Sequence, residues 1–75
     1  MDDRMTQLAE TVCDEIDRDP DDVPVDADRD NVDGWDSLAH LRIVTAVESR
    51  FGIRLTMQQI SEARSISDLA RMIEL

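Results

Sequence analysis

Residues 34–52 read GWDSLAHLRIVTAVESRFG and hold the densest apolar pattern in this sequence. The apolar positions with helical spacing are Leu38, Leu41, Ile43, Val44, Val47 and Phe51. Gly52 follows directly, and glycine is the common residue just past the C-terminus of a helix. The stretch therefore predicts a helix that begins at Ser37 and ends before Gly52. Ser37 stands where an acidic, turn-forming segment gives way to this helix.

Helical patterns flank this stretch on both sides. Before it, apolar residues recur at steps of three and four, which predicts an amphipathic helix over about residues 3–18 that stops at Asp19-Pro20. After it, residues 56–59 read TMQQ, a capping box that opens a short helix to about residue 63. Residues 65–68 read SISD, a similar box before a last helix. No stretch has a strand pattern, so we predict an all-α fold. It is a small four-helix bundle with a long loop between helices 1 and 2 and a short third helix, in a single domain over residues 1–75.

The segment between the first two helices is rich in aspartate. Residues 19–36 contain eight aspartates, two prolines and one glycine, with Val23, Val25, Val32 and Trp35 as the substantial apolar side chains. We predict a long structured loop that these spaced apolar residues hold against the core, with Trp35 packing it onto the bundle.

The aspartates of this loop also raise the possibility of a calcium site. Asp26, Asp28 and Asp30 match positions 1, 3 and 5 of an EF-hand loop, but position 6 is Asn31 and not glycine, and position 12 is Ser37 and not glutamate. A specific calcium site is therefore not expected.

The net charge limits the possible partners. Eighteen acidic and eight basic residues give a formal charge of -10 at pH 7, which repels nucleic-acid phosphates and anionic membranes. We expect neither nucleic acid nor a membrane as a partner. The acidic first residues do not form a signal peptide, and no run approaches the ~20 apolar residues of a membrane span. Cys13 is the one cysteine and is expected to act as a small hydrophobic side chain. These features favour a cytoplasmic, monomeric protein.

Three roles are open to Ser37. As an N-cap, its oxygen would accept a backbone N–H of the first turn, worth about 0.5–2 kcal/mol. As a nucleophile it would use His40, three residues on, but the G-x-S-x-G elbow is absent, and so small a domain is not expected to offer a cleft. As an attachment point, it would lie where the positive end of the helix dipole favours a phosphate ester. The residues alone leave the cap and the attachment point open.

One family combines these features. The run WDSLAHL at residues 35–41, the AVE at 46–48, the FGI at 51–53 and the ISDL at 66–69 resemble the acyl carrier protein family. The resemblance spans Met5 to Leu75 and includes the long loop. The D-S-L string is short and common. Its combination with the E-x-x-F-G-I ending of the second helix, at the expected distance, makes the resemblance specific.

The resemblance implies a function for Ser37. In this family the serine of D-S-L receives 4′-phosphopantetheine from coenzyme A through a phosphopantetheinyl transferase, and the thiol of the arm holds acyl or aminoacyl cargo as a thioester. The chain itself would not be an enzyme, because the chemistry belongs to partner acyltransferases, ligases or synthases. Asp36 would be used with magnesium during the transfer, although an acidic side chain that favours a helix N-terminus fits equally well.

The family likeness also gives expectations for the second helix. Partner enzymes are predicted to contact Leu38, Ala39, Leu41, Arg42 and Glu48. Where family members bury their cargo, the lining residues here would be Ile43, Val47, Phe51 and Ile60, which we expect to be core. His40 is expected on the solvent side of the helix.

The charge of this helix bears on the pathway. Carriers of fatty acid synthesis usually have an acidic outer face on the second helix, but Glu48 is the only acid between Ser37 and Gly52. This difference predicts a discrete carrier of a polyketide, nonribosomal peptide or other specialised pathway. The alternative is an acidic helical interaction module without a prosthetic group, in which Ser37 is only a cap.

Overall fold

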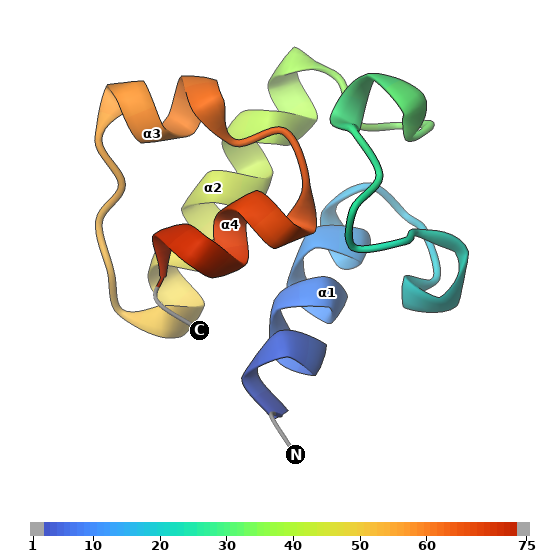
Figure 1. The fold of residues 1–75 in the computed structure, drawn as a ribbon, viewed down its shortest axis with the longest axis horizontal. Coiled ribbons are helices and arrows are strands. Elements are labelled where there is room, and N and C mark those ends of the chain that lie inside the picture. Colours follow the sequence, from blue (N-terminus) through green and yellow to red (C-terminus); the bar gives the residue numbers. More distant parts are fainter. Residues whose placement is uncertain (1–2, 74–75) are drawn as a thin grey trace.

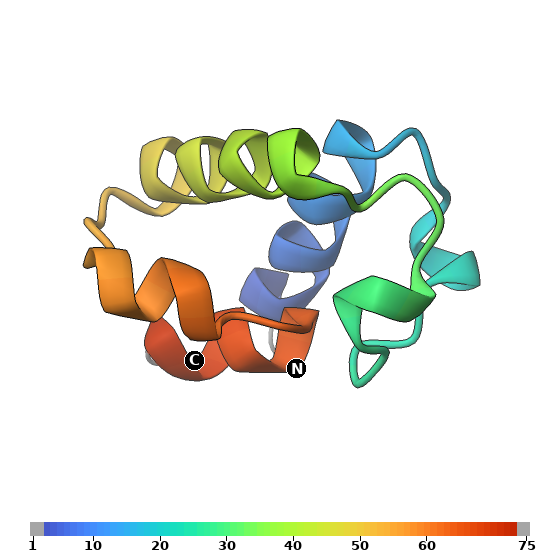
Figure 2. The ribbon, with the colours of Figure 1, turned by 90° about the horizontal axis from the view of Figure 1, so that it is seen from above.

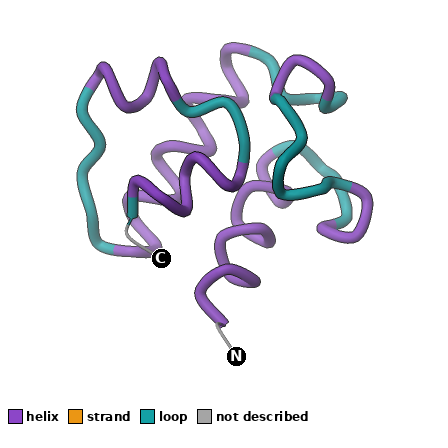
Figure 3. The backbone as a smooth tube through the Cα atoms, viewed as in Figure 1, coloured by secondary structure: helices purple, strands orange, loops and turns teal. Residues whose placement is uncertain are grey.

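The computed structural model describes residues 3–73. Its elements are α1 (Asp3–Glu15), the 3-10 turns η1 (Pro20–Asp22) and η2 (Arg29–Asn31), α2 (Ser37–Phe51), α3 (Met57–Glu62) and α4 (Ile66–Met72). Within these residues every regular element is helical (Figure 3). The predicted all-α class, the long loop between the first two helices and the short third helix are confirmed. None of the helices in the described range is long and apolar enough to cross a membrane.

The helices enclose one core. α2 lies along one side of the molecule and α3 and α4 along the other, with α1 crossing between them (Figure 2). α1 packs against both α2 and α4. The loop that carries η1 and η2 covers the end of the molecule where α2 begins (Figure 1). This arrangement places residue 37 at the corner where the loop, α2 and the end of α3 come together.

The buried side chains come from all the long elements and from the loop. Leu8, Ile43, Ile66 and Leu69 are fully buried, which joins α1, α2 and α4 in one apolar cluster. Cys13 is also fully buried, in line with the prediction that it acts as a small hydrophobic residue. From the loop, the side chains of Val23 and Trp35 are buried and that of Val32 packs against the cluster. The loop is thus held against the core as predicted, although Val25 is exposed.

Helix α1 ends three residues before the predicted residue 18. Asp17 takes a left-handed backbone conformation with φ of 60°. The N–H of Arg18 then reaches back to the carbonyl of Cys13 at 3.0 Å. This is the hydrogen bond of a Schellman-type helix end, which glycine usually makes and an aspartate makes here. The prediction was wrong because it took Pro20 as the stop signal.

Side-chain caps start the two short helices. Thr56 Oγ1 accepts the N–H of Gln59, and the Gln59 side chain accepts the N–H of Thr56, so the predicted capping box is confirmed. Ser65 caps α4 by accepting the N–H of Asp68. The Asp68 carboxylate accepts from the N–H of Arg64 and not from that of Ser65, so the second box is only half formed.

The aspartate-rich loop is tied to the segment between α3 and α4. Arg64 bonds the carboxylates of both Asp28 and Asp30, and Ser67 Oγ donates to Asp26 at 2.8 Å. The three aspartates of the EF-hand-like pattern therefore bind side chains of this chain. Between residues 3 and 73, no group of three or more His, Cys, Asp or Glu side chains is arranged to hold a metal ion. Their role in this structure is to fasten the loop.

Candidate functional site

Asp36, and not Ser37, caps α2. Oδ1 of Asp36 accepts the N–H of Ala39 at 2.8 Å, and the Asp36 carbonyl accepts the N–H of His40 at 2.8 Å. The cap role that the sequence left open for Ser37 therefore belongs to Asp36, because aspartate caps a helix as well as serine does and Asp36 has the extended backbone of a cap. Ser37 becomes the first helical residue. Its side chain is exposed and makes no hydrogen bond within residues 3–73.

A surface groove of about 480 Å³ lies beside Ser37. Its apolar lining comes from Trp35, Leu41 and Ile60, and its polar lining includes Arg29, Asp30 and Ser61. The expectation that so small a domain has no cleft is therefore wrong. The groove exists because η2 and the end of α3 lie on either side of the start of α2, an arrangement that local sequence patterns do not reveal.

His40 lies below this groove and is buried, with 5% of its surface exposed. Nδ1 accepts the indole N–H of Trp35 at 3.0 Å, and Nε2 lies 2.7 Å from the carbonyl oxygen of Ile60. Because an indole N–H can only donate, Nδ1 must be the acceptor and Nε2 carries the hydrogen that Ile60 accepts. Burial lowers the pKa of His40, and the Ile60 carbonyl partly opposes this. The ring is thus neutral, and both of its nitrogens are occupied.

These contacts correct one expectation about His40 and add a reason against the pairing of Ser37 with His40 that the sequence already disfavoured. The residue is not on the solvent side of the helix, and its ring is not free to act as a base for Ser37. A signal for its burial was present in the sequence: His40 precedes the buried Val44 by four residues and Val47 by seven, which places all three on one helix face.

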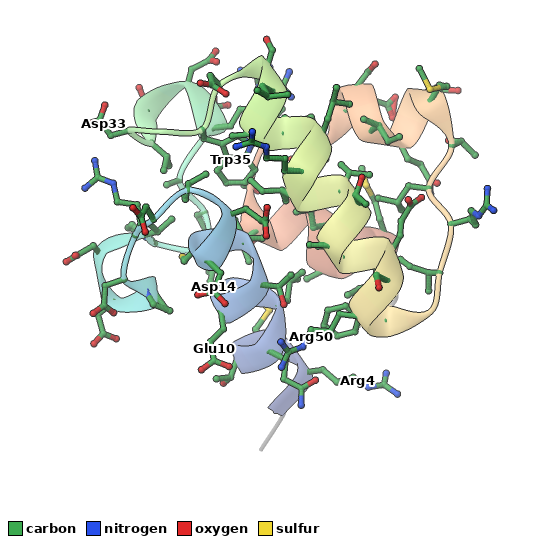
Figure 4. All side chains as sticks on the ribbon, turned by 180° about the vertical axis from the view of Figure 1, so that it is seen from behind. Arg4, Glu10, Asp14, Asp33, Trp35 and Arg50 are labelled. Atoms are coloured by element: carbon green, nitrogen blue, oxygen red, sulfur yellow. The ribbon has the colours of Figure 1, made fainter. Side chains whose placement is uncertain are left out.

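Trp35 packs the loop onto the bundle as predicted. Its side chain is 6% exposed, and its ring stacks on that of His40 with centroids 6.1 Å apart and an angle of 27°. Figure 4 shows Trp35 where the loop joins α2. Since Trp35 is two residues from Ser37, its position fixes the chain that enters the corner.

The corner is electrostatically suited to a phosphate group. The backbone N–H groups of Ser37 and Leu38 have no acceptor within the described residues, because they lie in the first turn of α2, before the helical hydrogen bonds begin. They lie at the positive end of the α2 dipole. Arg29 also lines the groove, and its guanidinium makes no hydrogen bond or ion pair within residues 3–73. Sequence patterns did not point to Arg29, because it reaches the groove only through the path of the loop.

The residues predicted to meet partners divide into two groups. Leu38 and Leu41 are 58% and 55% exposed, and Arg42 is exposed next to them on α2. Ala39 is 6% exposed, so it belongs to the core and offers partners almost no side chain. Glu48 is half-buried, and its Oε2 accepts the N–H of Leu55 at 2.8 Å. This carboxylate fastens the connection between α2 and α3.

The four residues predicted as core line the inside of α2 and its neighbours. Ile43 and Val47 are fully buried. Phe51 and Ile60 are half-buried against the same cluster, and Ile60 also borders the groove beside Ser37. Their expected role as core is consistent with these positions.

The comparisons with known proteins agree with this geometry. A family model described as the phosphopantetheine attachment site matches residues 6–73. A search of curated proteins gave no match. The match covers almost all of the described helices, including the loop and the corner at which α2 begins. The chain therefore belongs to the phosphopantetheine attachment family, to which acyl carrier proteins belong, and its domain is a site of covalent 4′-phosphopantetheine attachment.

Proposed function

We propose that Ser37 carries the 4′-phosphopantetheine arm and that the chain presents acyl or aminoacyl intermediates, held as thioesters, to partner enzymes. The observation that carries this proposal is the exposed Ser37 hydroxyl at the first residue of α2, which is not used as a cap. When bound, the arm supplies a terminal thiol and a tether that raises the local concentration of cargo at an active site. A phosphopantetheinyl transferase is the enzyme that would load it.

The residues around Ser37 fit such a group. The N–H groups of Ser37 and Leu38 and the guanidinium of Arg29 would hold its phosphate. Asp30 lines the same groove, but its carboxylate is paired with Arg64 at 2.6 Å, which offsets its repulsion of an anion. Asp36 uses only Oδ1 in the cap, and its second oxygen makes no hydrogen bond within residues 3–73. That oxygen is the one we propose to work with magnesium during transfer.

The partner surface that we propose is the outer side of the first half of α2. Leu38 and Leu41 are large apolar side chains that are more than half exposed beside the attachment serine. Exposed apolar residues of this size next to a reactive group are typical of a docking site. Arg42 adds a positive charge at its edge.

We propose a specialised pathway, such as polyketide or nonribosomal peptide synthesis, from the charge of this surface. Arg42 and Arg50 are exposed on α2, whereas the one acid of the helix, Glu48, is occupied by the Leu55 N–H. Complementary charges select partners and set the rate of association. A surface of this kind suits enzymes that carry acidic residues around their docking site.

Incubation with coenzyme A and a promiscuous phosphopantetheinyl transferase, followed by intact-mass measurement, tests the attachment. We expect the wild-type chain to gain the mass of one phosphopantetheinyl group and Ser37→Ala to stay unmodified. Ser49→Ala is the matched control, since Ser49 is an exposed serine on the same helix and its loss should leave loading unchanged. A wild-type chain that stays at its original mass would leave only an acidic interaction module.

The pathway needs a separate test. Enzymes of housekeeping fatty acid synthesis, given the loaded chain, should elongate its cargo more slowly than on their own carrier. Arg42→Glu should narrow this difference, because it makes the docking surface more acidic. Equal elongation of the two wild-type carriers would refute the assignment to a specialised pathway.

A further inference from the structure

Three segments around the groove meet at the side chain of His40. Trp35 belongs to the loop two residues before Ser37, His40 lies in the first turns of α2, and Ile60 lies in α3. The hydrogen bonds from Trp35 to His40 and between His40 and the Ile60 carbonyl measure 3.0 and 2.7 Å. Trp35, His40 and Ile60 all line the groove beside Ser37. The imidazole is therefore the link that joins both walls of the groove to the helix that bears Ser37.

We propose that His40 is a positioning residue for the loading of Ser37, and that protonation of its ring loosens the corner and slows loading at acidic pH. This inference rests on the proposed function of Ser37. It assigns no chemical step to His40, because neither ring nitrogen is free to reach the hydroxyl.

The chemistry of the ring explains the pH dependence. Nδ1 must keep its lone pair to accept the Trp35 N–H, and protonation places a hydrogen there. The imidazolium would then face the Trp35 donor with no acceptor to offer. Trp35 would have to move, and the chain leading to Asp36 and Ser37 would move with it.

The charges around the ring also resist protonation. Arg29, from η2, and Arg64, after α3, both disfavour the charged ring. The acids on the groove are Asp30, which is paired with Arg64, and Asp36, whose Oδ1 holds the Ala39 N–H. Neither acid makes a hydrogen bond to the imidazole. Burial is the largest cause that lowers the pKa of His40 below its ordinary value of 6.5, and the hydrogen bond to the Ile60 carbonyl partly opposes it.

A competition experiment isolates the effect of His40 from the pH dependence of the transferase. Wild-type and His40→Gln chains are mixed in one tube with coenzyme A and the promiscuous transferase. Their loading is followed by mass from neutral pH down into the acidic range, since the pKa of His40 lies below its ordinary value of 6.5. The Gln amide can donate to Ile60 and accept from Trp35 but does not titrate. We expect the ratio of wild-type to variant loading rates to fall over this range by up to roughly 100-fold, the loss that a reacting group misplaced by about 1 Å can cause.

The emission of Trp35, the one tryptophan of the chain, gives a second measurement. In the unmodified wild type it should change in a single step below pH 6.5, and this step should be absent in His40→Gln.

Trp35→Phe tests the same hydrogen bond from its other end, since it keeps an aromatic ring in place and removes the N–H donor. Its loading should be slow at neutral pH and should approach that of wild type at acidic pH.

Thr11→Val serves as the stability control, because it removes a different buried side-chain hydrogen bond, from Thr11 to the Gln7 carbonyl in α1. Its loading relative to wild type should not change with pH. A constant ratio of wild-type to His40→Gln loading, with wild type loaded normally, overturns this inference and leaves the attachment proposal intact. A wild-type chain that is never loaded overturns both.

Discussion

The guanidinium of Arg64 holds both carboxylate oxygens of Asp28, which lies 36 residues earlier in the sequence. Arg64 Nε donates to Oδ2 at 2.8 Å, and Nη2 donates to Oδ1 at 2.9 Å. The backbone N–H of Arg29 also donates to the Arg64 carbonyl at 2.6 Å. This two-pronged contact joins η2 to the end of α3, and these are the two segments on either side of the groove. The loop that leads to Ser37 is therefore held by an ion pair as well as by the buried side chains of Val23 and Trp35.

We predict that Asp28→Asn and Arg64→Gln each lower the melting temperature and that the double variant loses less than the sum of the two. A two-pronged pair of this kind holds its geometry better than a single surface contact, so its coupling should be measurable although both side chains are partly exposed. A thermodynamic cycle of the four chains, from urea unfolding, gives the coupling. Strict additivity would show that the pair adds nothing to the fold.

The same ion pair should also affect how the unfolding free energy depends on pH in the acidic range. Hydrogen bonds from Arg64 and from the Asp30 N–H lower the pKa of Asp28 from 3.8 to about 2. A carboxyl whose pKa is lower in the folded than in the unfolded chain adds stability that is present above pH 3.8 and is lost as the pH falls toward about 2. Unfolding free energies measured across this window should therefore fall less steeply in Asp28→Asn than in wild type. Asp22→Asn is the control, since the Asp22 side chain makes no hydrogen bond or ion pair within residues 3–73, and an equal flattening there would contradict the assignment.

Sequence patterns predicted the start or end of a helix well where it is fixed by residues close by in the sequence. The box at Thr56 and Gln59 and the end of α2 at Gly52 are such cases. The start of α2 at Ser37 was predicted correctly, but the sequence left Ser37 open as its cap, a role that Asp36 takes, because both residues are good caps. This single residue matters for the site, since it frees the Ser37 hydroxyl.

The features that sequence patterns missed depend on the path of the loop. The groove, the contact of Arg64 with Asp28 and the position of Arg29 all arise from residues that are far apart along the chain. No local periodicity encodes such contacts, because they are fixed only when the loop has folded over the end of the bundle. The family was nevertheless predictable, since its motif at residues 35–41 is contiguous.

Repulsion between acidic side chains should destabilise the C-terminal end of α1. Glu10 and Asp14 lie four residues apart on the same side of α1, and Figure 4 shows them side by side. The last turn of this helix has no basic residue, so Asp14 also faces the negative end of the helix dipole. We predict that Asp14→Asn raises the unfolding free energy by about 0.3–1 kcal/mol at low ionic strength.

The dependence on salt concentration tests whether the stability gain of Asp14→Asn is electrostatic. Ions screen exposed charges over about a Debye length, so the advantage of Asp14→Asn should shrink as sodium chloride is added. The wild-type melting temperature should itself rise with salt, because the net charge of -10 repels itself in the compact chain. Asp14→Glu keeps the charge and should show no gain. A melting temperature that does not respond to salt would contradict the electrostatic explanation.

The two glycines have positive φ angles for different reasons, and alanine at each should have a different cost. Gly52 ends α2 with φ of 65°, and a Cβ added there would meet nothing within 4 Å. Gly34 has φ of 89°, and its Cβ would lie 3.1 Å from the carbonyl oxygen of Ile16, where backbone has little freedom to move. Gly52→Ala should therefore cost about 1–2 kcal/mol for the left-handed conformation alone. Gly34→Ala should cost more, because the same strain is joined by a steric contact with α1's end.

Urea unfolding of both variants gives the order of the two costs. Gly34→Ala should also shift the emission of Trp35, its neighbour, since the loop must move away from Ile16 to admit the methyl group. Gly52→Ala should leave that emission unchanged because it lies at the opposite end of α2. If Gly52→Ala were the more damaging of the two, the close approach of Gly34 to Ile16 would not be what positions the loop before Ser37.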